Sequence, residues 1–252
     1  MVEITENKIN IQVMGRTFAQ IKEDGYDTLT EQEISTFRDS LALIHDVVNN
    51  KWPKEMSEAF DVFLKNYGWH IRLWMHPNDL IPYIQQGHDA VDKFFIKQLR
   101  FSTIKLRRQS IKQFPHRRQM INRAFISHWQ GNYLASIPLF LILSEGIFRE
   151  LTGNDLFSKN PKSKMANIVK ERQDVQFTPL MIHIIDAVSN GDIIGLRFSN
   201  DEYLKYPNVL SRNKILHGAD SAYGTKVNAY KAISQFEFVI ESVFMAFTGK
   251  II

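Results

Sequence analysis

The segment SRNKILHGADSAYGT, at positions 211–225, gathers the residue types that phosphodiester chemistry uses. Arg212, Asn213 and His217 fall within six positions, ahead of a glycine and a polar turn. A histidine gains or loses a proton near neutral pH and an arginine stays charged, so this pair suits proton transfer beside a phosphate. On a helix, Asn213 and His217 share a face, while Arg212 and His217 lie about 140° apart around the axis. Gly218 is placed to end that helix, which puts His217 in its last turn.

Other catalytic signatures are missing from the sequence. GxxxxGK[ST], GxGxxG, GxSxG and HExxH do not occur, which argues against P-loop, dinucleotide, serine-hydrolase and zinc-protease chemistry. The chain has no cysteine, so disulfides and thiolate metal sites are excluded. His70 and His76 are the nearest histidine pair, and their separation of six residues suits no helical metal site. We therefore expect neither a metal nor a cofactor.

Positive charge is concentrated in one part of the chain. Residues 100–123 carry eight basic side chains and no acidic one, whereas the formal net charge of the whole chain is only +4. A basic block attracts polyanions, because each phosphate that it neutralises releases condensed counterions. The alternative is a solvated helix face. If the block binds RNA, the best candidates for contact are Arg107, Arg108, Arg117 and Arg118.

Hydrophobic periodicity predicts helices along most of the chain. Apolar residues at steps of three and four, with capping residues at the ends, predict helices over 31–50, 53–68, 89–114, 117–151 and 225–247, and two short helices within 164–198. No stretch shows the sustained alternation of a sheet. We therefore predict an all-α fold, with an N-terminal helical region of unknown role at 1–114 and a C-terminal helical bundle at 115–252.

The sequence also bears on where the protein works. Its N-terminus, MVEITENKINIQ, lacks the basic-then-apolar pattern of a signal peptide. The longest strongly apolar stretch, 137–143, is too short to cross a bilayer. Together with the lack of cysteine, these features favour a cytoplasmic protein that has no membrane partner.

The 211–225 segment resembles the motif of the HEPN superfamily (higher eukaryotes and prokaryotes nucleotide-binding domain). That motif is an Arg, usually followed by a polar residue, and then a His after a short spacer; here four residues separate Arg212 from His217. The continuation HGADSAYGTKVNAYKAI is similar to the HG…YGT…N pattern of prophage- and defence-associated members. The earlier segment RRQMINRAFISHWQGNYLASIPLFLILSEGIF is similar to the first long helix of the same group. The resemblance covers roughly residues 115–247.

This resemblance implies an α-helical bundle that forms a homodimer, bringing two copies of the motif together. It also implies a metal-independent endoribonuclease that acts in phage defence, toxin–antitoxin systems or stress responses, with an antitoxin or regulatory protein as a further partner. His217 would be the general acid/base when the RNA 2′-OH attacks the adjacent phosphate. Arg212 would stabilise the charge that develops on that phosphate, and Asn213 would orient His217 or the phosphate. Since RNA supplies its own nucleophile, this mechanism needs no metal or activated serine.

Two other functions remain open. One is a non-catalytic HEPN-like scaffold that binds a partner protein or a nucleotide. The other is a nucleic-acid-binding protein whose working element is the basic segment 100–123. The motif itself also has a structural interpretation, in which Arg212 pairs with a helix-end carboxylate and His217 caps carbonyl groups.

A few further residues carry specific predictions. Glu145 interrupts an apolar helix stripe, so we expect it to be paired, with Arg212 or in another ion pair. His128 is interpreted as a hydrogen-bonded histidine on a helix face, and Trp69 and Trp74 as core residues rather than platforms for RNA bases. Tyr223 is expected to pack in the turn, and Thr225 to cap the last helix.

Overall fold

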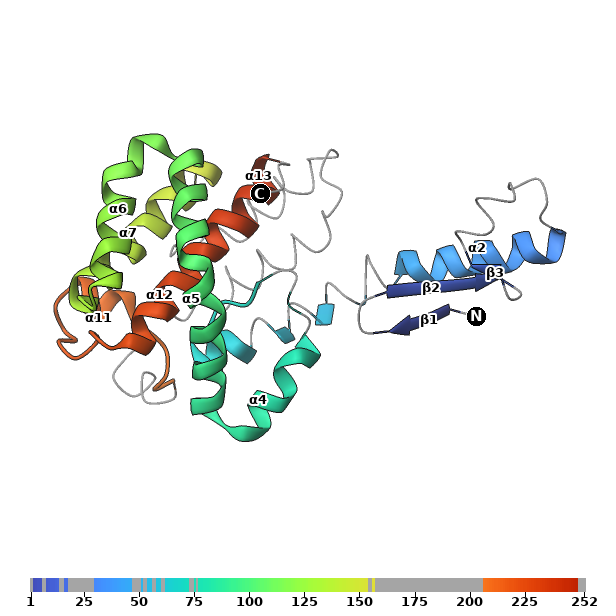
Figure 1. Ribbon diagram of the computed structural model, residues 1–252, viewed down its shortest axis with the longest axis horizontal. Coiled ribbons are helices and arrows are strands. Elements are labelled where there is room, and N and C mark those ends of the chain that lie inside the picture. Colours follow the sequence, from blue (N-terminus) through green and yellow to red (C-terminus); the bar gives the residue numbers. More distant parts are fainter. Residues whose placement is uncertain are drawn as a thin grey trace. The chain divides into compact units, whose positions relative to one another are not determined.

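The computed structural model describes residues 2–5, 8–13, 16–17, 30–46, 51, 54–55, 58–59, 62–72, 75, 77–153, 156 and 206–248. The chain divides into two compact units, 1–53 and 54–252, and each is described by itself (Figure 1). The boundary lies well before the division at 114 that the sequence suggested. The long helix at 88–113 packs on helices of the C-terminal part, and it therefore belongs to the second unit.

The N-terminal unit contains a small antiparallel sheet and one helix. Strands β1 (Val2–Thr5), β2 (Lys8–Val13) and β3 (Arg16–Thr17) follow one another in that order, with Val2 opposite Ile11. Helix α2 (Glu31–Asp46) lies against β2. These strands were not foreseen from the sequence. Apolar residues do alternate at Ile9, Ile11 and Val13, but a run of this length is too short to separate a strand from a helix by periodicity.

From residue 62 onward, every element in the described part of the chain is helical (Figure 1), which confirms the predicted helical fold for that unit. The two short helices expected within 164–198 lie outside the described residues. The elements are the π-helical turn η3 (Phe63–Tyr67), the 3-10 turn η4 (Pro77–Leu80), α4 (Ile81–Gln86), α5 (His88–Gln113), the 3-10 turn η5 (Pro115–Arg117), α6 (Arg118–Trp129), α7 (Tyr133–Thr152), α11 (Arg212–Leu216), α12 (Lys226–Phe238), the π-helical turn η6 (Val239–Val243) and α13 (Phe244–Thr248).

The single helix expected over 117–151 is in fact two helices, α6 and α7. Gly131 has a φ of +75°, a left-handed conformation that glycine adopts without steric cost. Asn132 then caps α7, because its side chain accepts a hydrogen bond from the backbone N–H of Ala135 at 3.4 Å. The chain therefore turns between the two helices, which pack against each other.

Helix α12 is the centre of the second unit. Every residue from Ala229 to Phe238 is buried, and the burial continues through Val239 and Ile240. The rings of Phe125 (α6), Phe140 (α7) and Phe236 (α12) meet with centroid distances between 4.9 and 6.0 Å. This aromatic cluster joins α6, α7 and α12 in one core.

An extended segment at 68–72 also packs on α12. The backbone N–H of His70 donates to the Ser234 hydroxyl at 3.3 Å, and Arg72 pairs with Glu237 at 2.7 Å. Trp69 is fully buried and stacks on Phe95 with ring centroids 4.8 Å apart, so the prediction that it is a core residue is confirmed. Residues early in this unit are thus tied to residues near its end.

Candidate active site

The motif residues lie on α11, a helix of five residues that is anchored at both ends. Ser211 is its N-cap, with the side chain accepting from the N–H of Lys214 at 3.4 Å. Ile215 is buried and fixes the helix to the bundle. Gly218 has a φ of +73°, and its N–H donates to the carbonyl of Ile215 at 3.2 Å. The predicted end of the helix at Gly218 is therefore confirmed.

Arg212, at the first position of α11, forms a salt bridge with Glu145 of α7. The two side chains are 22% and 21% exposed, so the pair lies at the edge of the core, where charges are only partly hydrated. This contact confirms that Glu145 is paired, and with Arg212. The carboxylate comes from the middle of α7 rather than from a helix end. A guanidinium has five N–H donors, so a carboxylate partner uses only some of them.

His217 occupies the C-cap of α11 and is exposed to solvent. Its backbone N–H donates to the carbonyl of Asn213 at 3.0 Å. The side chain of Asn213 is partly buried, one turn before His217. The short helix thus holds a fixed cation at its start and an accessible imidazole just past its end, an arrangement compatible with binding and proton transfer at a phosphodiester.

The turn that follows the motif has a structural role. The Tyr223 hydroxyl donates to the Leu134 carbonyl at 2.9 Å, and a Cβ at Gly224 would lie only 2.6 Å from the Leu134 side chain. Thr225 caps α12, accepting from the N–H of Asn228 at 3.1 Å. The predicted roles of Tyr223 in the turn and of Thr225 as a cap are both confirmed. The YGT sequence therefore fixes the turn against the start of α7.

The basic segment 100–123 spans α5, η5 and the first half of α6. Arg107 donates to Asn122 at 2.8 Å and lies over the Trp129 ring at 5.9 Å. Arg117 donates to Glu150 and to the carbonyl of Gly146, each at 3.1 Å. Two of the four predicted RNA contacts, Arg107 and Arg117, are thus engaged within the protein. The other two, Arg108 and Arg118, are exposed.

Sequence reasoning missed a cluster of charged residues around Glu237 of α12, with Glu241 of η6 and Arg72 beside it. Glu237 accepts two hydrogen bonds from Arg72, at 2.7 and 2.8 Å, and one from the Ser102 hydroxyl at 3.2 Å. Burial, together with the charge of Glu237, raises the pKa of Glu241 to about 8, and Arg72 and Lys105 oppose that rise. These groups line a cavity of about 230 Å³. The sequence did offer a signal for this cluster, because charged residues occur within the otherwise apolar pattern of 225–247.

No three His, Asp or Glu side chains in the described ranges lie close enough together to hold a metal ion. Among the helices of the described part, none is both long and apolar enough to cross a membrane.

No protein-family model, characterised protein or solved structure matches the chain. A function must therefore be inferred from the residues and their geometry.

Proposed function

We propose that the protein is a metal-independent endoribonuclease of the HEPN type, with Arg212 and His217 as its central residues. It acts in the cytoplasm as a homodimer in phage defence or a stress response. The observation that carries the proposal is the division of roles on α11. Arg212 is held by Glu145, while His217, five residues later, is exposed to an incoming strand.

The chemistry is an internal transesterification. The RNA 2′-oxygen attacks the adjacent phosphorus, the bond to the 5′-oxygen breaks, and the products end in a 2′,3′-cyclic phosphate and a 5′-hydroxyl. His217 takes the proton of the 2′-OH, and the copy of His217 in a second subunit protonates the departing oxygen. Arg212 stabilises the negative charge on the phosphate in the transition state, and Asn213 orients the reacting groups.

Glu145 has a defined place in this scheme. Its carboxylate fixes the direction of the Arg212 side chain, so little conformational entropy is lost when a phosphate binds. Arg212 and His217 lie about 140° apart around the helix axis, so one copy of the motif does not direct both side chains to the same point. In a dimer, the motif of the second subunit can complete each site. The basic segment 100–123 supplies further phosphate contacts, chiefly through the exposed Arg108 and Arg118.

The test is incubation of the purified full chain with total tRNA and with an mRNA transcript in EDTA. We expect cleavage by the wild type and a loss of about 100-fold or more in His217→Ala, the range for removal of a general acid/base. Arg212→Lys keeps the charge and loses the planar fork of the guanidinium, so it should retain only part of the activity. Mapping of the ends should find 2′,3′-cyclic phosphates.

Matched controls are available for both substitutions. His88→Ala removes another exposed histidine, and Arg149→Ala removes an exposed arginine near the end of α7, outside the basic segment. Both should cleave as the wild type does, and thermal unfolding should establish that every variant is folded. Equal cleavage by the wild type and His217→Ala, or no cleavage by any of them, contradicts the proposed active site.

A second candidate function is RNA binding without cleavage. The exposed basic side chains on α5 and α6 favour it, as does the use of Arg212 in an intramolecular salt bridge. In that case His217→Ala should leave RNA binding intact, whereas Arg108→Glu with Arg118→Glu should abolish it.

A further inference from the structure

A second site lies in a pocket between α5, α6, α7 and α12, and none of its lining residues belongs to α11. The pocket has a volume of about 490 Å³. Ligand pockets are typically about 300–1,000 Å³, so this one has the size for a small molecule or a single unit of a polymer. Its most informative lining residues are Arg100, His128, Trp129, Tyr133, Lys226 and Tyr230.

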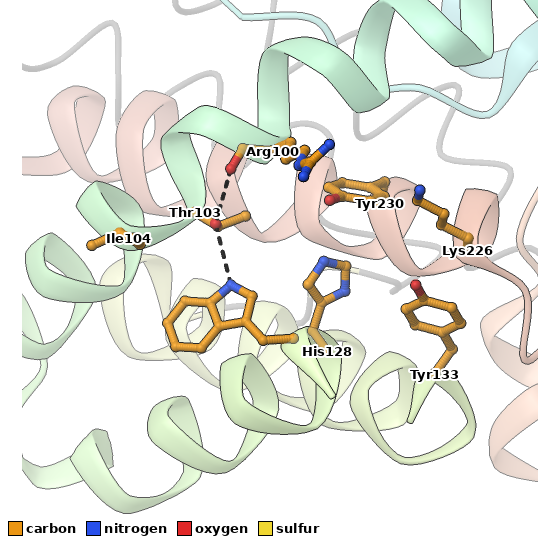
Figure 2. Close-up of a pocket in the computed structure, with 8 residues that line it drawn as sticks. Arg100, Thr103, Ile104, His128, Tyr133, Lys226 and Tyr230 are labelled. Atoms are coloured by element: carbon orange, nitrogen blue, oxygen red, sulfur yellow. Dashed lines mark hydrogen bonds between the residues drawn. The ribbon is translucent and has the colours of Figure 1, made fainter. Parts of the chain in front are cut away.

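The charge of the pocket favours an anion. Arg100 of α5 and Lys226 of α12 are exposed cations, and no acidic side chain is among the lining residues. Figure 2 shows both of these side chains near the Tyr230 ring, although they come from different helices. The charge of Arg100 reaches the Tyr230 hydroxyl and offsets part of the rise in its pKa that burial and Tyr133 cause. A phosphate bound here would be opposite two positive charges.

The rings of the pocket favour a flat partner. Trp129 is 46% exposed, and its indole N–H donates to the Thr103 hydroxyl at 3.3 Å. Since Arg107 lies over the same ring at 5.9 Å, the indole is fixed in direction before any ligand arrives. Stacking on such a ring is tolerant of sequence, because every nucleobase has a π face.

His128 also lines the pocket, and its imidazole ring points into it (Figure 2). The residue is only 4% exposed, and its buried Nδ1 has no hydrogen-bond partner among the residues that the structure describes. The ring packs edge-on against Tyr230 with centroids 4.7 Å apart. Burial, with a smaller contribution from Lys226, lowers the pKa of His128 to about 4, so the ring is neutral at pH 7.

We propose that this pocket binds a planar aromatic ring that carries a phosphate, the combination present in a nucleotide. The phosphate lies between Arg100 and Lys226, and the ring stacks on the exposed indole of Trp129. The ligand is either a free nucleoside monophosphate or one nucleotide of an RNA strand. This site does not depend on cleavage at His217.

Isothermal titration calorimetry of the full chain tests the proposal. The ligands are the four nucleoside 5′-monophosphates and their 3′ isomers, the unphosphorylated nucleosides, inorganic phosphate, and a five-residue single-stranded oligoribonucleotide. We expect Arg100→Ala and Lys226→Ala each to weaken binding of the phosphorylated ligands about tenfold, the effect of losing one charged hydrogen bond. Trp129→Leu should weaken binding by a similar factor through the loss of stacking.

The controls separate this site from the proposed active site. Arg149→Ala removes the same charge from an exposed position that lies outside both the pocket and the basic segment 100–123, and it should bind as the wild type does. His217→Ala should likewise bind normally. Binding of the free monophosphates identifies a free nucleotide as the ligand, whereas binding of the oligoribonucleotide alone identifies one nucleotide of a strand.

Three outcomes overturn the proposal. One is that neither the monophosphates nor the oligoribonucleotide bind at millimolar concentration. Another is that binding is the same in Arg100→Ala and Lys226→Ala as in the wild type. The third is that inorganic phosphate alone binds as tightly as the monophosphates, because the rings of the pocket would then contribute nothing.

Discussion

Replacement of Glu241 by Gln should make the protein more stable, by an amount that grows with pH. In the folded protein, burial and the neighbouring charge of Glu237 raise the pKa of Glu241 from 4.5 to about 8, although Arg72 and Lys105 pull it down. Between these two pH values, the folded chain holds a proton that the unfolded chain has released. Wild-type stability therefore falls as pH rises from about 4.5 to about 8, and a neutral Gln removes this dependence.

The size of the effect follows from proton linkage. Each pH unit in that interval costs the wild type about 1.4 kcal/mol, so the upper limit between pH 5 and pH 7 is roughly 3 kcal/mol. The carboxyl lines a cavity of about 230 Å³, and any water there reduces the penalty. We therefore expect the advantage of Glu241→Gln to increase by about 1–3 kcal/mol over these two pH units.

The assay is urea unfolding of both proteins at pH 5, 6, 7 and 8, monitored by circular dichroism. The quantity of interest is the slope of the stability difference against pH, because a packing defect at the new amide adds only a constant. Glu58→Gln makes the same change at an exposed position and should unfold in parallel with the wild type. A difference between Glu241→Gln and the wild type that is flat or declines with pH refutes the reasoning.

Two further predictions concern stability. Gly68→Ala should lower the free energy of unfolding by more than about 2 kcal/mol, because φ is +73° and the added Cβ would lie 2.6 Å from the Asn208 carbonyl oxygen. Gly131→Ala should lower it by only about 1 kcal/mol, because φ is similar at +75° but no atom lies within 4 Å of the added Cβ. Equal losses in thermal unfolding contradict this contrast. A double-mutant cycle of Glu145→Gln and Arg212→Gln should give a coupling energy of about 1–3 kcal/mol, between the values for exposed and buried pairs, since the two side chains are 21% and 22% exposed. A coupling near zero in chemical unfolding means that the salt bridge does not stabilise the protein.

Local signals in the sequence located several elements well. The periodic pattern and Pro115 placed one helix at 89–114, and α5 spans 88–113. Gly153 and Gly218 adopt the left-handed conformation expected at helix ends, with φ of +72° and +73°. These features succeed because capping and proline chemistry act within a few residues.

Features decided by distant partners were not predictable. Helix α12 does not read as a central helix, because Lys231, Gln235 and Glu237 interrupt its apolar pattern, yet all three are buried. Lys231 donates to the Asn208 carbonyl at 2.7 Å, and Glu237 pairs with Arg72, 165 residues earlier. No local pattern identifies such partners.

In the candidate site, too, some features could be predicted from the local sequence and others depend on distant residues. The Arg212–Glu145 contact was foreseen as one of two options, because an acidic residue in an apolar stripe needs a partner. His128 was interpreted as hydrogen-bonded, but Nδ1 has no partner in the described part of the protein, so that interpretation was wrong for this atom. Its setting depends on Tyr230, which lies about a hundred residues further along the chain.

The packing of residues 68–72 on α12 affects how the second unit is made as well as how it is held. The His70–Ser234 and Arg72–Glu237 bonds close loops of 164 and 165 residues. The chain must lose the entropy of closing so long a loop before the contacts at its ends can stabilise it. The unit is therefore expected to fold slowly. During synthesis, Arg72 leaves the ribosome long before Glu237 is made, and Trp69 meets Lys231 only after α12 has been made. The apolar side chains of this segment therefore stay uncovered until α12 has been made, and such exposed surface favours aggregation during synthesis.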